Sequence, residues 1–200
     1  MRSFTEAVTN RRSIYALGKN IPVLQTEIMA AIERMTREVP SPFNMQSARV
    51  VVTMGEHHEN IWHITENALR KIVPEDKFEP TKQKMDGFAA GYGTILFFEE
   101  SDTVYEMQKK FATYAESFPI WAAQANGMLQ FAIWTELENM GLGVNIQHYN
   151  MLIEEDVRKI FDLPGSLDLV AQMVFGEKLA DAQPIEKIST GERVKVFRKW

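Results

Sequence analysis

Two adjacent arginines and a serine, Arg11, Arg12 and Ser13, stand near the N-terminus of a chain with a net charge of −5. Two guanidinium groups and a hydroxyl beside backbone N–H groups suit a bound phosphate, because phosphate accepts several charge-assisted hydrogen bonds at once. The same residues also suit a solvated helix C-terminus, where cations interact favourably with the helix dipole. The segment therefore predicts a phosphate site or a helix end.

Two side-chain amides, those of Asn44 and Gln46, stand two residues apart in the segment S-P-F-N-M-Q-S at 41–47. On an extended backbone, side chains with this spacing point to the same side. An amide carries a donor and an acceptor together, which suits the edge of a heterocycle or a ribityl chain. A loop with Asx-type turns is the alternative.

Basic side chains also gather at the C-terminal end, in G-E-R-V-K-V-F-R-K-W. Arg193 and Lys195 alternate with valines, so a strand over 193–197 would place both on one face, and Arg198 follows that strand. A polar basic tail without a ligand is the alternative interpretation.

The elements that must position these groups can be predicted from capping residues and periodicity. Ser3 and Glu6 have the spacing of a capping box, which predicts a helix over 4–10 that ends at the arginines. Apolar residues at helical spacing predict helices over 24–38, 57–73, 104–117, 119–140 and 152–161. Runs of β-branched and apolar residues predict strands over 48–54, 94–98, 168–175 and 193–197. This order predicts a single α+β domain over residues 1–200.

The helix over 119–140 is the longest expected element, and Gly141 stands just past its end. It is apolar on more than one face and contains small residues such as Ala123 and Gly127, which permit close helix contact. A helix this apolar must be covered on most sides, and a chain of 200 residues has few other elements to cover it. A second copy of the chain is the expected cover, so we predict a homodimer.

Composition excludes several classes of function. The chain is 45% apolar and 24% charged, as globular proteins are, and it has no long basic run, so we expect no nucleic-acid partner. It has no cysteine, which excludes thiolate metal sites and a catalytic thiol. His57, His58 and His63 lack the spacing of a zinc motif and are interpreted as solvated helix residues, so no metal is expected. No signal peptide or membrane span is recognisable, and we expect a cytoplasmic protein.

Four segments taken together resemble the nitroreductase family of FMN-dependent NAD(P)H oxidoreductases. They are N-R-R-S-I-Y at 10–15, S-P-F-N-M-Q-S-A-R at 41–49, G-Y-G-T-I-L-F-F at 91–98 and G-L-G-V-N-I-Q-H-Y-N at 141–150. The resemblance is greatest to the branch that contains the fungal fatty-acid-repression proteins and the bacterial copper-induced nitroreductases. It implies a central, mostly antiparallel sheet flanked by helices, a dimer with a long interface helix, and FMN as the cofactor.

The resemblance also implies roles for individual residues. Arg11, Arg12 and Ser13 would hold the phosphate and the pyrimidine side of FMN. Asn44 and Gln46 would lie on the isoalloxazine or ribityl side, often from the partner subunit. The remaining candidates are Lys195 or Arg198 at the phosphate, Gly143 beside the flavin, and His148, Phe43 and Trp121 on the acceptor side.

The implied activity is passage of a hydride from NAD(P)H through flavin N5 to a nitroaromatic, a quinone or a related acceptor in a ping-pong cycle. The flavin carries the chemistry, so no catalytic side chain is expected. Two alternatives remain open. One is a flavin-binding sensor or store without significant turnover, and the other is a dimeric module that binds another phosphorylated ligand.

Overall fold

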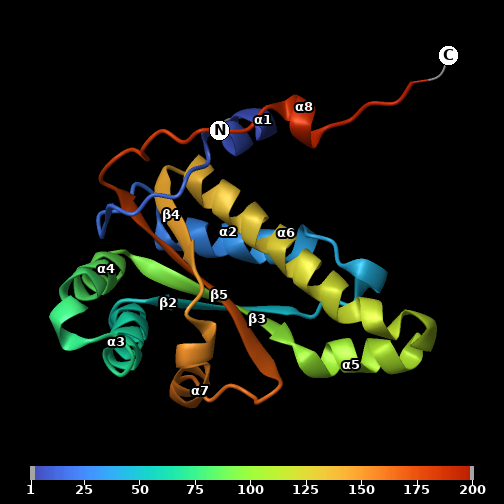
Figure 1. Ribbon diagram of the computed structural model, residues 1–200, viewed down its shortest axis with the longest axis horizontal. Coiled ribbons are helices and arrows are strands. Elements are labelled where there is room, and N and C mark those ends of the chain that lie inside the picture. Colours follow the sequence, from blue (N-terminus) through green and yellow to red (C-terminus); the bar gives the residue numbers. More distant parts are fainter. Residues whose placement is uncertain (1–2, 199–200) are drawn as a thin grey trace.

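A five-stranded antiparallel sheet forms the centre of the computed structural model, which describes residues 3–198 (Figure 1). Its strands are β1 (Leu17–Gly18), β2 (Ala48–Met54), β3 (Gly93–Glu100), β4 (Leu142–Gln147) and β5 (Leu167–Lys178). The order is β1-β5-β3-β2, and β4 also pairs with β5. All four strand pairings are antiparallel. The predicted fold class, a mostly antiparallel sheet flanked by helices, is thereby confirmed.

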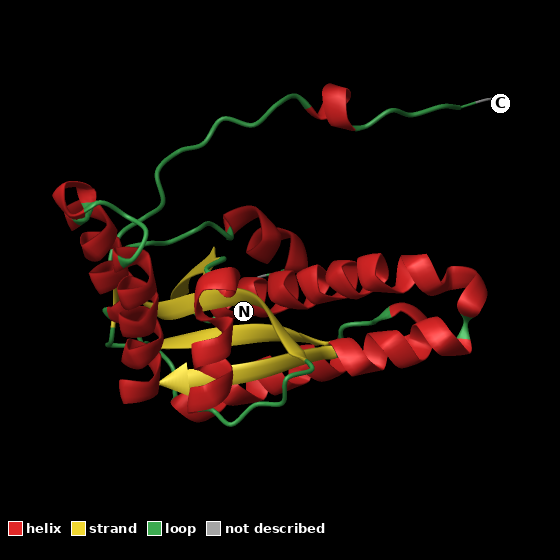
Figure 2. Cartoon of the chain, turned by 60° about the horizontal axis from the view of Figure 1, so that its bottom comes forward, coloured by secondary structure: helices red, strands yellow, loops and turns green. Residues whose placement is uncertain are grey.

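Helices cover both faces of this sheet (Figures 1 and 2). One face packs against α3 (Glu56–Arg70), α4 (Glu79–Ala89) and α7 (Asn150–Ile160), and the other against α2 (Gln25–Glu38) and α6 (Phe118–Asn139). Strand β3 serves both cores: Leu96 and Phe98 belong to the first, and Ile95 and Phe97 to the second. Successive side chains of a strand point to opposite faces, so a continuous apolar run such as T-I-L-F-F is what a doubly covered strand requires.

The shorter elements connect these layers. Helix α1 (Phe4–Asn10) begins with the predicted capping box, in which the Ser3 backbone N–H donates to Glu6 and the Glu6 N–H donates to Ser3 Oγ. The others are α5 (Ser101–Lys110), α8 (Thr190–Arg193) and three 3-10 turns, η1 (Pro42–Asn44), η2 (Glu75–Lys77) and η3 (Ala112–Ser117). None of the helices within residues 3–198 is long and apolar enough to cross a membrane.

Helix α6 buries one side against the sheet and leaves an apolar stripe on the other. Leu129 and Ile133 are in the core, whereas the side chains of Ile120, Met128 and Phe131 are 61%, 46% and 40% exposed. These three residues lie at helical spacing on one side of α6. Gly127 lies between them, and a Cβ at that position would contact nothing. The stripe is therefore flat enough for another helix to approach closely.

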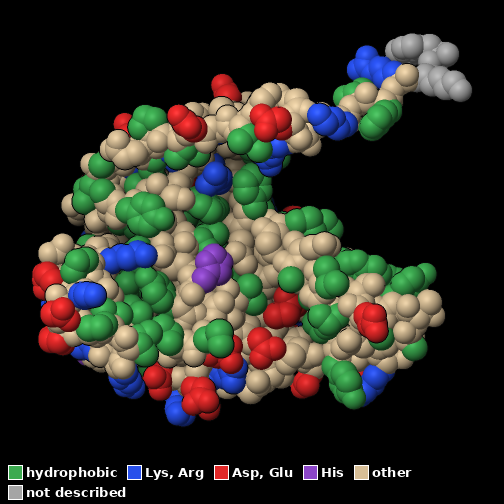
Figure 3. Space-filling model, in the orientation of Figure 1, with side chains coloured by type: hydrophobic (Ala, Val, Ile, Leu, Met, Phe, Trp, Pro, Cys, Tyr) green, Lys and Arg blue, Asp and Glu red, His purple; other side chains and the backbone are tan. Residues whose placement is uncertain are grey.

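The C-terminal tail, residues 179–198, leaves the body of the protein (Figures 1 and 2). Every residue in it except Ala182 is exposed, including apolar side chains such as Ile185, Val194 and Phe197. Figure 3 shows a deep hollow between the tail and the rest of the molecule.

The structure corrects the predicted strand over 193–197. Arg193 ends α8, and the residues from Val194 to Arg198 have no regular secondary structure. A strand needs a neighbour for its backbone N–H and C=O groups, and the described part of the chain offers none to this segment. Elements α4, β1 and β4 were not predicted, and the predicted helix over 104–117 is divided into α5 and η3.

Candidate functional site

Arg11 and Arg12 lie where α1 ends against the C-terminal half of α6. The Arg11 guanidinium lies over the indole ring of Trp134, 4.2 Å from the ring centroid. The backbone N–H of Arg12 donates to both carboxylate oxygens of Glu138, at 3.1 and 2.9 Å. Trp134 Nε1 donates to the same carboxylate at 2.7 Å. Glu138 thus fixes the Arg12 backbone and the ring on which Arg11 stacks.

Burial raises the pKa of the Glu138 carboxyl above its usual value. The hydrogen bonds from the Arg12 backbone and from Trp134, together with the charge of Arg11, oppose that rise because each favours the ionised form. Neither Trp134 nor Glu138 was singled out from the sequence. Their i, i+4 spacing is the signal that could have found them, because it places an indole N–H beside a carboxylate on one helix face.

Strand β4 holds the residues that follow the arginines. The backbone N–H of Ile14 donates to Val144 O at 2.9 Å, and Asn145 Nδ2 donates to Ile14 O at 2.8 Å. Gln147 Nε2 in turn donates to Asn145 Oδ1 at 2.9 Å. Asn145 is fully buried, and its side-chain amide gives the Ile14 carbonyl the hydrogen bond that a backbone N–H would otherwise supply.

Gly143 is buried beneath the same segment. A Cβ at this position would lie 2.7 Å from Leu17 Cδ2 and 2.9 Å from Ile14 Cγ2. Close packing of Ile14 and Leu17 on β4 therefore accounts for a glycine here. The predicted contact between Gly143 and a flavin stays a prediction.

A cavity of about 520 Å³ separates the arginine segment from the start of the tail. Arg11, Arg12 and Ser13 line one side of it, and residues 180–183 with Ile185 line the other. The Arg12 guanidinium donates to the backbone carbonyl of Gln183. The three residues predicted to hold a phosphate therefore lie together on one cavity wall, at the end of a helix.

Asn44 and Gln46 lie in a tightly folded loop, which we call the amide loop (residues 41–47). The backbone is not extended here, because Phe43, Asn44 and Gln46 have φ values of 54°, 52° and 50°, so of the two alternatives the segment is a loop. This left-handed region costs roughly 1–2 kcal/mol for a residue with a Cβ, although Asn tolerates it. A bulky side chain such as that of Phe43 is especially unusual in the left-handed region. Strain of this kind gathers at functional sites, where the surrounding contacts maintain it.

The amide loop is anchored by the residues between its amides. Met45 is buried against Val104, Phe118 and Ala122, whereas Asn44 and Gln46 are exposed. Phe43 lies among four aromatic rings at the junction of η3 and α6. Its ring centroid is 4.7 Å from that of Phe111, 5.4 Å from Phe118, 6.0 Å from Tyr114 and 6.0 Å from Trp121, the last nearly parallel. Two predicted acceptor-side residues, Phe43 and Trp121, are thus in contact beside the exposed amides.

One chain does not bring the amide loop and the arginine segment together. The loop packs on Trp121 near the start of α6, and Arg11 packs on Trp134 near its end. Thirteen residues of α-helix separate these two tryptophans, which corresponds to about 20 Å. The remaining candidates lie elsewhere: His148 is exposed just beyond β4, and Lys195 and Arg198 are exposed on the tail, where Lys195 Nζ donates to Gly191 O at 2.8 Å.

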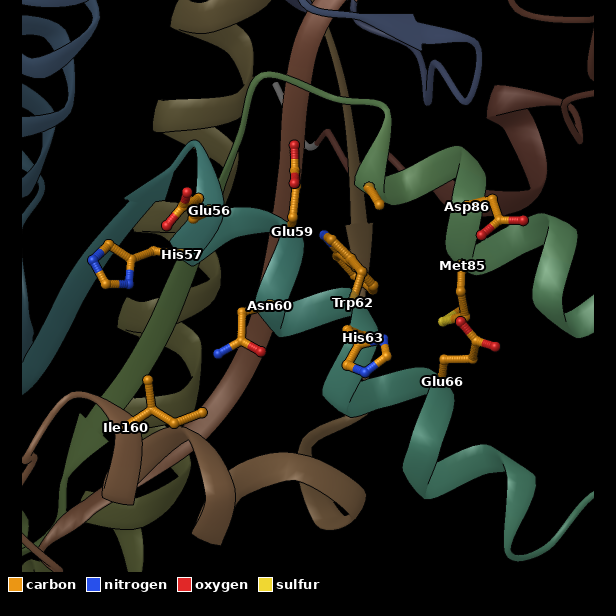
Figure 4. Close-up of a pocket in the computed structure, with 11 residues that line it drawn as sticks. Glu56, His57, Glu59, Asn60, Trp62, His63, Glu66, Met85, Asp86 and Ile160 are labelled. Atoms are coloured by element: carbon orange, nitrogen blue, oxygen red, sulfur yellow. The ribbon is translucent and has the colours of Figure 1, made fainter.

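A larger cavity of about 690 Å³ lies on the far face, along α3 (Figure 4). Most of its lining comes from α3, including His57, Glu59 and His63, and Asp86 comes from α4. Glu59 is paired with Lys19, and Asp86 with Lys82. Among residues 3–198 no group of three or more histidine and carboxylate side chains is arranged to hold a metal ion.

His58 corrects the expectation that all the α3 histidines are solvated, since its side chain is buried. Nε2 lies 3.3 Å from the carbonyl oxygen of Ala89, and Nδ1 lies 2.8 Å from Thr94 Oγ1. Because a carbonyl can only accept, Nε2 carries the hydrogen and Nδ1 accepts from Thr94. Burial lowers the pKa of His58 to about 4, which keeps the ring neutral.

Comparison with known proteins agrees with this fold. The family model described as "Nitroreductase family" matches residues 8–177. Two Saccharomyces cerevisiae proteins match over 98% of this chain and 97% of their own length: nitroreductase FRM2 at 29% identity and the putative nitroreductase HBN1 at 30%.

Solved structures lead to the same family. Nitroreductase CinD from Lactococcus lactis, in complex with chloramphenicol, is 37% identical with a TM-score of 0.90, over 98% of this chain and 100% of that one. CinD has also been solved with 4-nitrophenol and with nicotinic acid. A putative Desulfovibrio desulfuricans nitroreductase in complex with FMN shares the fold, with a TM-score of 0.72 at 15% identity and 99% coverage of each chain. The chain therefore belongs to the nitroreductase family, a family of oxidoreductases.

Proposed function

We propose that this protein is an FMN-dependent oxidoreductase that takes hydride from NAD(P)H and delivers it to nitroaromatic, quinone or related acceptors. We further propose that it works as a homodimer with FMN bound between the two subunits. One observation carries the proposal. The two segments suited to a flavin nucleotide, the arginine segment and the amide loop, lie at opposite ends of α6 in one chain.

A two-fold pairing of α6 resolves this separation. If two α6 helices pack antiparallel through their exposed stripes, the arginine segment of one protomer comes beside the partner's amide loop. The stripe of Ile120, Met128 and Phe131 supplies the apolar surface for such a contact, and Gly127 permits close approach. The apolar tail would extend over the partner and bring Lys195 or Arg198 towards the phosphate.

The residues present fit FMN. Arg11, Arg12 and Ser13 on one cavity wall offer cations and a hydroxyl for the phosphate. The exposed amides of Asn44 and Gln46 offer donors and acceptors for the polar edge of the ring system. Arg12 would also place positive charge beside the pyrimidine ring, which favours a negatively charged ring.

The chain's own contribution would be binding and orientation. Bound FMN would supply the hydride chemistry at N5. Phe43 and Trp121 would form an apolar aromatic wall against which a flat acceptor can lie, and His148 would face the opening. The complexes of CinD with chloramphenicol and 4-nitrophenol support nitroaromatics as the acceptor class for this chain.

The proposal is tested by comparing FMN with riboflavin, which lacks the phosphate. The purified protein should show the yellow absorbance of bound flavin, and NAD(P)H should bleach it. Arg11→Ala should weaken FMN binding by about 2–5 kcal/mol, because it removes one charged partner of the phosphate, and should leave riboflavin binding nearly unchanged. Equal losses for the two ligands would move the phosphate away from Arg11. A protein that binds flavin but is not reduced by NAD(P)H would instead be a flavin store or sensor.

A further inference from the structure

The amide loop combines three left-handed residues within four positions, and none of them is glycine. Phe43, Asn44 and Gln46 all have φ near 50°, a region that side chains with a Cβ rarely adopt. A free loop of this sequence would leave that conformation. Specific contacts must therefore hold it, and the structure identifies two of them in polar groups that the proposed function does not use.

Ser41 and Arg49 provide these polar contacts. Ser41 Oγ accepts a hydrogen bond from the backbone N–H of Gln46 at 2.9 Å. Arg49, the second residue of β2, reaches back so that Nη1 donates to Gln46 O at 2.6 Å and to Ala48 O at 3.1 Å. Both polar groups of the Gln46 backbone are thus bonded to side chains, one from the start of the loop and one from β2, which fixes the residue that carries the second amide.

We propose that Arg49 is a positioning residue for the cofactor: it holds the Gln46 carbonyl so that the Asn44 and Gln46 amides face the flavin ring in one preformed arrangement. This inference rests on the proposed function, because it takes the amide loop to contact the flavin. Its physical basis is preorganisation. A loop already held in its binding conformation loses less conformational entropy when the ligand binds.

The competing interpretation is that Arg49 binds the FMN phosphate directly through its charge. The two roles differ in which part of the ligand they affect. A phosphate contact matters for FMN and not for riboflavin. A residue that positions the ring-binding amides matters equally for both, because the two ligands share the ring and the ribityl chain.

The experiment measures FMN and riboflavin dissociation constants for the full-length protein and for Arg49→Met. The loss of hydrogen bonds from a charged donor corresponds to roughly tenfold weaker binding or more. We expect this factor for both ligands. Arg37→Met is the matched control, because Arg37 and Arg49 line one groove of about 590 Å³ and Arg37 pairs only with its exposed neighbour Glu38 among the described ion pairs. It should leave both constants within about twofold.

A second measurement asks whether Arg49 acts through Gln46. In a Gln46→Gly background, where the second amide is absent and the left-handed strain is relieved, Arg49→Met should cause a smaller loss of either ligand than in the unaltered protein, because only the Asn44 amide is left to be positioned. If Arg49→Met does not fold, Arg49→Lys replaces it. A lysine keeps the charge without the guanidinium fork, and we expect a smaller loss that is again equal for both ligands.

The possible results distinguish a failure of this inference from a failure of the proposed function. An Arg49→Met protein that behaves like Arg37→Met overturns the inference. So does a loss confined to FMN, which would make Arg49 a phosphate contact, and so does an undiminished loss in the Gln46→Gly background. Failure of the unaltered protein to bind either ligand would overturn the proposed function instead.

Discussion

At the scale of single residues, Glu138 supports the arginine segment by accepting hydrogen bonds from two donors on different elements. The Arg12 backbone N–H and Trp134 Nε1 both donate to its half-buried carboxylate. Glu136, two residues earlier on the same helix, pairs with Arg34, whose side chain is 49% exposed and can be solvated when its partner is removed. These two acids on one helix give a matched pair for mutation.

We predict that Glu138→Ala lowers the free energy of unfolding by about 2–3 kcal/mol, because it leaves two partly buried donors unpaired. Glu136→Ala should cost less, about 1 kcal/mol, because water can solvate the half-exposed Arg34 that it leaves behind. Chemical denaturation of the flavin-free proteins measures both values. Equal effects would show that Glu138 contributes no more than an acid whose partner is open to solvent.

His58 links stability to pH through its buried neutral ring. Its pKa is about 4 in the folded protein, against 6.5 for an ordinary histidine, because burial disfavours the charged form. The unfolded chain therefore binds a proton more readily than the folded protein as the pH falls. The stabilisation is complete above pH 6.5 and is lost as the pH decreases from 6.5 to 4.

The shift of about 2.5 pH units predicts a loss of about 3 kcal/mol between pH 7 and pH 4 that His58 itself causes. His58→Leu should be less stable at pH 7 but should show a shallower decline towards pH 4. Urea denaturation of both proteins across this range isolates the histidine, since all other titrating groups are shared. Parallel stability curves would rule the histidine out as the source.

At the scale of elements, α6 is apolar on two opposite sides, and only one of them is covered by this chain. Its sheet-facing side must be apolar to build the core, and its outer stripe is apolar although this chain leaves it exposed. Helices that face water on one side ordinarily carry polar residues there. An outer stripe of Ile120, Met128 and Phe131 is therefore typical of a helix with a partner.

We predict that Met128→Lys prevents dimer formation and releases FMN together with it. A charge in the middle of an apolar interface would be buried without a partner, which costs several kcal/mol. Asn67→Lys is the control, because Asn67 is exposed on α3, which covers the opposite face of the sheet. Sedimentation and absorbance measured on the same samples report assembly and flavin content. A Met128→Lys monomer that keeps its FMN would contradict the shared site.

At the scale of the whole molecule, the proposed site is a property of two chains. The arginine segment, the amide loop and the tail belong to different regions of one protomer, and α6 spans the distance between the first two. In the proposed dimer, a site enclosed in this way would hold one FMN with one open side. Reductant and acceptor would then use that opening in turn.

Steady-state kinetics test this arrangement. With NAD(P)H and a quinone or nitroaromatic varied together, double-reciprocal plots should give parallel lines, as expected when the first product leaves before the second substrate binds. Converging lines would indicate that donor and acceptor bind together, which a single shared opening does not allow.

The sequence alone predicted much of the architecture, for local reasons. Alternating and continuous apolar runs identified β2, β3 and β5, and helical periodicity with caps identified α1, α2, α3, α6 and α7. These patterns can be read from residues close together in the sequence, because backbone sterics and the side-chain face that is buried decide locally between helix and strand. The segments proposed to bind the cofactor, Arg11–Ser13 and the Asn44 and Gln46 pair, were likewise selected from residue types at close spacing.

Tertiary structure decided what depends on neighbours distant in the chain. Strand β4 forms because β5 pairs with it, whereas the equally strand-like 193–197 has no neighbouring strand edge within residues 3–198. Three features depend on side chains that the fold brings in from elsewhere. They are the left-handed amide loop, the burial of His58 and the anchoring of Arg12 by Glu138. Local spacing could not reveal these contacts, because their free energy comes from burial and hydrogen bonds that exist only once the chain has folded.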